Sequence, residues 1–168
     1  AMFSSLEYKS ISLKSIHLDI DNPRIVTERK LKTQEEIVNY LFLYEDLGPF
    51  IQKIALEGKN FGAERPYVVR EGRIYTVIEG NTRIAAYKVL CDLIDVPSKF
   101  AAAVPKISDG LKAALLNVDC SIAPSRDALM PIMANAHFGL GDKSKWGYLG
   151  SRKAVYNAWR GGKDVSSL

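Results

Sequence analysis

Five consecutive residues, Glu79–Gly80–Asn81–Thr82–Arg83, combine side chains that could hold a phosphate group. They follow a β-branched and aromatic run, Arg73–Ile78, and precede an apolar helical pattern, which predicts a strand-to-helix junction. The first amides of a helix have no internal partner and carry partial positive charge. Glycine permits close approach of a ligand, threonine adds a hydroxyl, and arginine adds a fork that matches phosphate oxygens. The predicted phosphate-binding residues are Gly80, Asn81, Thr82 and Arg83.

The same five residues have a purely structural interpretation. Asn81 or Thr82 could simply cap the helix, and Gly80 could simply make the turn. Glu79 is a candidate general base beside a bound phosphate, and equally an exposed carboxylate that pairs with Arg83. The sequence leaves both alternatives open.

Other residues with the potential for chemistry form weaker patterns. Asp19, Asp21 and Glu79 could converge on Mg²⁺ as in a nuclease, although acids beside the Asn22–Pro23 turn are also common for turn chemistry alone. The register of His17 on a strand predicts a half-exposed position opposite the apolar side chains. The two cysteines, Cys91 and Cys120, lie in apolar stretches and are predicted to be small buried residues without zinc-binding companions.

Bulk properties are those of an ordinary globular chain. The 168 residues are 47% hydrophobic and 25% charged, with a net charge of +4, and include no apolar run long enough to span a bilayer. A cytoplasmic protein is therefore expected. Basic residues concentrate in the last segment, which is either a surface for DNA or a solvated helix face.

The elements that position these residues can be read from periodicity. Thr33–Glu36 forms a capping box, and Glu71–Gly72 turns a hairpin. A helix is expected from Asn81 to about Leu93, with Lys88 and Asp92 as a pair on its wet side. The remaining elements are expected as strands within 11–20 and 118–122, and as helices over 49–56, about 111–116, from 125 to about 139, and 146–159. This order predicts a compact α+β domain over residues 3–139, with a small mixed sheet, and a helical C-terminal extension over 140–168.

The segment Tyr75–Ala86 (YTVIEGNTRIAA) resembles the first nucleotide-binding box of the ParB/sulfiredoxin superfamily, in the ParB-like N-terminal ("nuclease") domain. The Asn22–Pro23 turn and the order of elements over most of residues 11–138 agree with this resemblance. A second box of the family corresponds here to Ala134–Asn135–Ala136–His137–Phe138. In this box Ala134 replaces an acid and Phe138 replaces an arginine.

The resemblance implies that Gly80–Arg83 contacts the phosphates of a nucleoside triphosphate and that Asn135 lies near phosphate and Mg²⁺. His137 either reaches a phosphate or acts as a partial cation at a helix C-terminus. The expected function is a nucleotide-binding domain of a bacterial, DNA-associated protein, and a homodimer is compatible with it. DNA would be bound through the basic C-terminal helix or a further C-terminal region. A metal-dependent nuclease, a small-molecule kinase with Glu79 as its base, and a non-catalytic interaction module remain alternatives, so weak NTPase or nuclease activity is left open.

Overall fold

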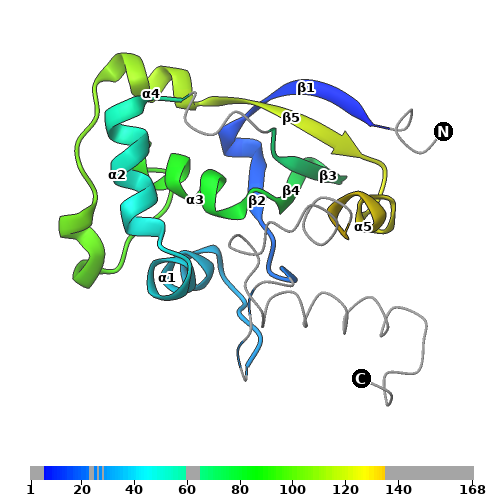
Figure 1. Cartoon of the computed structure of the whole chain (residues 1–168), viewed down its shortest axis with the longest axis horizontal. Helices are drawn as coiled ribbons and strands as arrows, with labels where there is room; N and C mark the ends of the chain where they lie inside the picture. Colours follow the sequence, from blue (N-terminus) through cyan, green and yellow to red (C-terminus); the bar gives the residue numbers. More distant parts are fainter. Residues whose placement is uncertain (1–5, 23–24, 26, 28, 60–64, 135–168) are drawn as a thin grey trace.

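A five-stranded mixed sheet organises the computed structural model, which describes residues 6–22, 25, 27, 29–59 and 65–134 (Figure 1). The strand order across the sheet is β1-β5-β3-β4-β2. Strands β1 and β5 are antiparallel, as are β3 and β4, whereas the pairs β3/β5 and β2/β4 are parallel. The strands are β1 (Glu7–Ser12), β2 (Ile16–Leu18), β3 (Tyr67–Glu71), β4 (Ile74–Glu79) and β5 (Asn117–Ala123). The expected α+β class with a small mixed sheet is confirmed.

Helices connect these strands and cover the sheet. They are α1 (Gln34–Tyr44), α2 (Leu47–Glu57), α3 (Asn81–Leu90), α4 (Asp109–Leu115) and α5 (Arg126–Ala134), with short 3-10 turns η2 (Leu13–Ser15) and η3 (Ser98–Ala103). The capping box at the start of α1 is confirmed, because Glu36 N donates to Thr33 Oγ1 at 3.1 Å and Thr33 N donates to Glu36 Oε1 at 3.2 Å. The predicted hairpin is also confirmed, as β3 and β4 pair from Glu71↔Ile74 onward.

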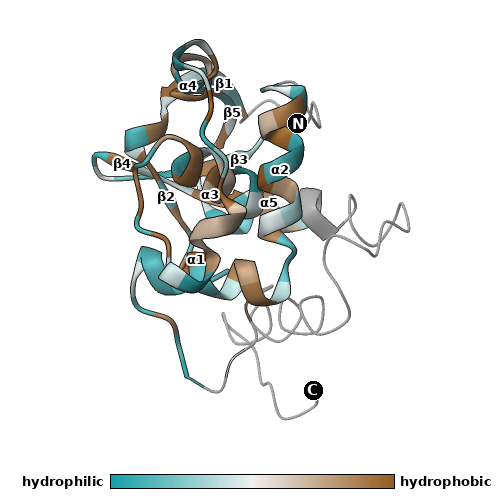
Figure 2. Ribbon diagram, turned by 90° about the vertical axis from the view of Figure 1, so that its left-hand side faces the viewer, coloured by the Kyte–Doolittle hydropathy of each residue, from teal (hydrophilic) through white to brown (hydrophobic). Residues whose placement is uncertain are grey.

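Both faces of the central strands are buried. Val68 and Val77 face the main core, which α1, α2 and α3 complete, whereas Val69 and Ile78 face a smaller core that Leu129 of α5 closes. This alternation follows from the two-residue period of side chains along a strand. In Figure 2 the hydrophobic colouring is strong along β2 and in parts of α3, at the centre of the molecule.

Helix α3 is shorter than the expected Asn81–Leu93. It ends at Leu90, and Asp92 then adopts a left-handed conformation with φ 58°. The amide of Leu93 donates back to the carbonyl of Lys88 at 2.8 Å, which closes the helix end in the way that a terminal glycine usually does. Asp92 therefore supplies the stop signal that the periodicity of the apolar residues did not reveal.

The last described residue is Ala134, so the expected extension over 140–168 lies outside the described residues. Within the described part, no helix has the length and apolar character that crossing a membrane requires.

Candidate functional site at the start of α3

Helix α3 begins at an N-cap residue that offers no capping side chain. Its N-cap is Gly80, with φ 112° and ψ 20°, and no side-chain hydrogen bond caps the helix; the first turn has no acidic residue. Helices α1 and α4 each receive such a bond, from Thr33 and Ser108 respectively. Helix α2 also begins without one, but its first turn, Leu47–Gly48–Pro49, offers no polar side chain. The start of α3 thus combines uncapped amides with a polar first turn.

Asn81 does not present its side chain to this helix start. It is 4% exposed, its Oδ1 accepts from the amide of Asp19 at 2.9 Å, and its Nδ2 donates to the carbonyl of Val77 at 3.0 Å. These bonds tie the ends of β2 and β4 to α3, which explains why an amide side chain is needed at this position. The side chain of Asn81 is therefore engaged within the protein, and its backbone N–H is the group that this residue could offer to the predicted phosphate.

Gly80 is required by packing as well as by backbone conformation. A β-carbon at this position would lie 3.0 Å from Cβ of Pro66 and 3.3 Å from its Cα. Pro66 is held in place because its carbonyl accepts from the amide of Ser121 at 2.9 Å. Besides permitting ligand approach, glycine at this position thus also avoids a tight contact between a β-carbon and Pro66.

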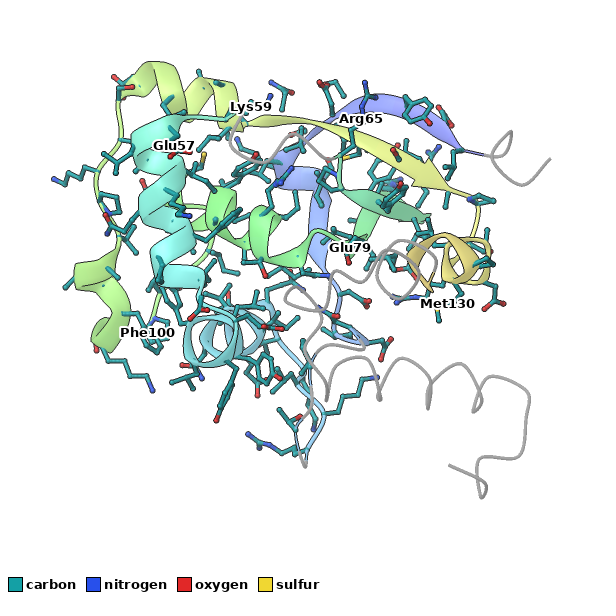
Figure 3. The ribbon with its side chains drawn as sticks, viewed as in Figure 1. Glu57, Lys59, Arg65, Glu79, Phe100 and Met130 are labelled. Atoms are coloured by element: carbon teal, nitrogen blue, oxygen red, sulfur yellow. The ribbon has the colours of Figure 1, made fainter. Side chains whose placement is uncertain are left out.

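Three half-buried residues surround the helix start: Glu79 at the end of β4, and Thr82 and Arg83 in the first turn of α3. Figure 3 labels Glu79 at the position where β4 leads into α3. Burial raises the pKa of the Tyr87 phenol, one turn later in α3, and the positive charge of Arg83 partly opposes this rise. Thr82 and Arg83 thus belong to the same turn as the first amides of α3.

A buried ion pair lies next to this junction and was not predicted. Both oxygens of Asp19, which is 0% exposed, accept from the guanidinium of Arg126 at 2.8 Å. Burial raises the pKa of Asp19, while the hydrogen bonds and charge of Arg126 act to lower it. The two short bonds from the planar guanidinium use both carboxylate oxygens as acceptors, which is the geometry of a bidentate ion pair. The 107 positions between the partners leave no local sequence signal for this contact.

This pair overturns the metal hypothesis for Asp19, Asp21 and Glu79. The Asp19 carboxylate is engaged by Arg126, and its Oδ1 also accepts from the amide of Asp21 at 2.9 Å, as expected of an acid in a turn. Asp21 itself pairs with Lys30 at 2.6 Å. Over the residues that the structure describes, no group of three or more metal-binding side chains is present.

Lys88 also differs from expectation. It was predicted on the wet side of α3 with Asp92, yet it is 7% exposed, and burial lowers the pKa of its ammonium. Asp92 instead pairs with Lys112 of α4 at 3.0 Å. The helix ends before Asp92, so the two residues do not share the i, i+4 geometry of one helix face.

The remaining candidates divide by location. His17 is half-buried on β2 as expected, and burial, assisted by Lys88, lowers its pKa. Cys91 and Cys120 are buried free thiols as expected. Asn135 and His137, predicted to lie near phosphate, fall outside the described residues.

Comparison of the chain with family models, curated proteins and solved structures finds no match.

Proposed function

We propose that this domain binds the phosphate groups of a nucleotide at the start of α3. The observation that carries the proposal is the helix start itself. Its N-cap is a glycine without a side chain, and its first residue, Asn81, turns its side chain inward. The N-cap residue therefore offers the backbone amides of the first turn no side-chain cap, and an anionic ligand is a natural partner for the start of such a helix.

The residues of this turn favour phosphate over other anions. Thr82 offers a hydroxyl, and the planar guanidinium of Arg83 can form two parallel hydrogen bonds to phosphate oxygens. The first turn contains no carboxylate that would repel a phosphate. The resemblance of Tyr75–Ala86 to the nucleotide-binding box of the ParB/sulfiredoxin superfamily supports the choice of a nucleotide.

Mg²⁺ would accompany the nucleotide as part of this proposal. Magnesium is commonly held by substrate phosphates with only one or two protein carboxylates, so it does not require a preformed cluster of acids. Glu79 is the carboxylate of this junction and would be the candidate to contact the metal or act as a base. Association with DNA rests on the family resemblance and on the basic C-terminal stretch, outside the described residues.

Calorimetric titration of the four ribonucleoside triphosphates, with and without Mg²⁺, tests the proposal. We expect saturable binding that Arg83→Ala weakens at least tenfold, in line with the loss of one charge-assisted bidentate contact. The matched control is Arg73→Ala, because Arg73 is exposed in the hairpin turn between β3 and β4. Absence of binding to any triphosphate, or equal losses in the two variants, would reject the site.

A further inference from the structure

The two edge strands of the sheet, β2 and β1, differ in length and in how side chains cover them. Strand β2 is only three residues long, and the side chain of Gln34 covers its end through two bonds with Leu18, N to Oε1 at 2.7 Å and Nε2 to O at 3.0 Å. Strand β1, at the opposite edge, is six residues long and pairs with β5 without any register shift. Figure 1 shows β1 along the outer margin of the molecule, with β5 as its neighbour.

Strand β1 lacks two of the usual devices that prevent edge-to-edge pairing, proline and a bulge, and its two charges are of opposite sign. Its sequence, EYKSIS, has no proline, and its ladder with β5 has no bulge. Residues Glu7 to Ser10 are exposed in the part of the chain that the structure describes. An exposed, straight edge presents a row of backbone donors and acceptors that another strand can use.

The charges on β1 are self-complementary. Glu7 and Lys9 point to one face of the sheet, and Tyr8 points to the other, because side chains alternate along a strand. Tyr8 is 64% exposed, and the guanidinium of Arg65, which is labelled in Figure 3, lies 4.9 Å from the Tyr8 ring centroid and restrains the ring beside the strand. The strand therefore carries one acid, one base and one positioned aromatic ring at consecutive places.

We propose that β1 pairs with β1 of a second copy of this chain, antiparallel, about a two-fold axis that passes through Tyr8. In this register Glu7 of each copy lies opposite Lys9 of the other, and the two Tyr8 rings are direct cross-strand neighbours. Opposite charges and aromatic pairs are favourable at such positions. The two sheets join into one continuous sheet, and the surface is independent of the start of α3.

Electrostatics selects this register over its neighbours. The two-fold axis that relates two antiparallel copies of β1 is perpendicular to the sheet. Because directly opposite residues point to the same face of the sheet, this axis passes midway between one residue and the same residue of the partner strand. An axis through Glu7 places Glu7 opposite Glu7, and an axis through Lys9 places Lys9 opposite Lys9, both of which are destabilising. An axis through Ser10 sets Lys9 against Ile11 and leaves the charges unmatched.

Sedimentation equilibrium up to about 1 mM protein tests the pairing, a range that reaches weak complexes. We expect a monomer–dimer equilibrium that Lys9→Glu or Glu7→Lys weakens about tenfold or more, because each reversal turns two opposite-charge pairs into two like-charge pairs. Lys106→Glu is the matched control, since Lys106 is exposed in the segment between η3 and α4.

Mixing the two variants makes the test specific for the register. In a heterodimer of Lys9→Glu with Glu7→Lys, one strand carries two acids and the other two bases at the facing positions, so dimerisation should return to at least the wild-type strength. Circular dichroism of each variant checks that the fold is retained. A monomeric wild type at all concentrations, or a mixture no stronger than its components, would overturn the proposal.

Discussion

Replacing Gly80 by alanine should destabilise the protein more than the same change at another glycine with positive φ. Gly80 has φ 112°, far from the backbone conformations that alanine favours, and an added β-carbon would lie 3.0 Å from Cβ of Pro66. Gly72, in the hairpin turn, has φ 69° and no heavy atom within 4 Å of the added β-carbon. The two variants therefore share a backbone penalty, and only Gly80→Ala adds a steric one.

The magnitudes can be separated. A left-handed conformation costs an alanine about 1–2 kcal/mol, which is the whole effect expected for Gly72→Ala. Forcing an extra methyl group into a packed site costs a further 1–3 kcal/mol or so, since carbon atoms prefer separations of about 3.5–4.0 Å. For Gly80→Ala we therefore expect a loss of about 2–5 kcal/mol in the free energy of unfolding.

Urea unfolding of the two variants and the wild type measures this difference, with the midpoint compared at a constant slope. Equal losses for Gly80→Ala and Gly72→Ala would refute the reasoning. That result would mean that Pro66 moves aside easily, and that the tight contact does not define the junction between β4 and α3.

Three further changes test other features. Arg126→Met should cost about 3 kcal/mol of unfolding free energy, because it leaves the buried Asp19 carboxylate without its partner; a loss below that of a typical surface substitution would contradict this. Since burial favours the protonated acid, the loss should shrink as the pH falls toward 3.8, the ordinary pKa of the group, as urea titrations at several pH values would show. Lys88→Met should stabilise the protein by about 1 kcal/mol at neutral pH, because it removes a buried ammonium. This gain should shrink as the pH rises toward 10.5, since above that pH the wild-type amine is neutral in both the folded and the unfolded state. A lower urea unfolding midpoint for Lys88→Met than for the wild type would contradict the burial argument. Burial raises the pKa of Cys120 to about 12 and also raises the pKa of Cys91. Iodoacetamide at pH 8 should therefore label neither thiol until urea unfolds the chain, which mass spectrometry would show. Rapid labelling of the folded protein would contradict this prediction.

Local features of the fold were predictable from the sequence because their determinants lie within a few residues. The capping box of Thr33 and Glu36 depends on positions three apart, and the hairpin of β3 and β4 depends on two apolar runs around a turn. The strand-to-helix junction at Gly80 was predicted for the same reason. The edge position of β1 was not, because its neighbour in the sheet, β5, lies more than 100 residues later.

The roles of individual side chains at the junction were decided by the tertiary structure. Asn81 bonds to Asp19 across 62 positions, and Asp19 pairs with Arg126 across 107, so no local pattern could distinguish an inward amide from a ligand-binding one. Lys88 is buried because α3 packs between the sheet and α2, which a helical pattern alone does not specify. The sequence by itself determined where α3 begins, since hydrogen bonding along the backbone is local, but it left open whether Asn81 or Thr82 caps this helix. Which side chains remain available at that place depended on contacts between distant segments, and only the folded chain brings those together.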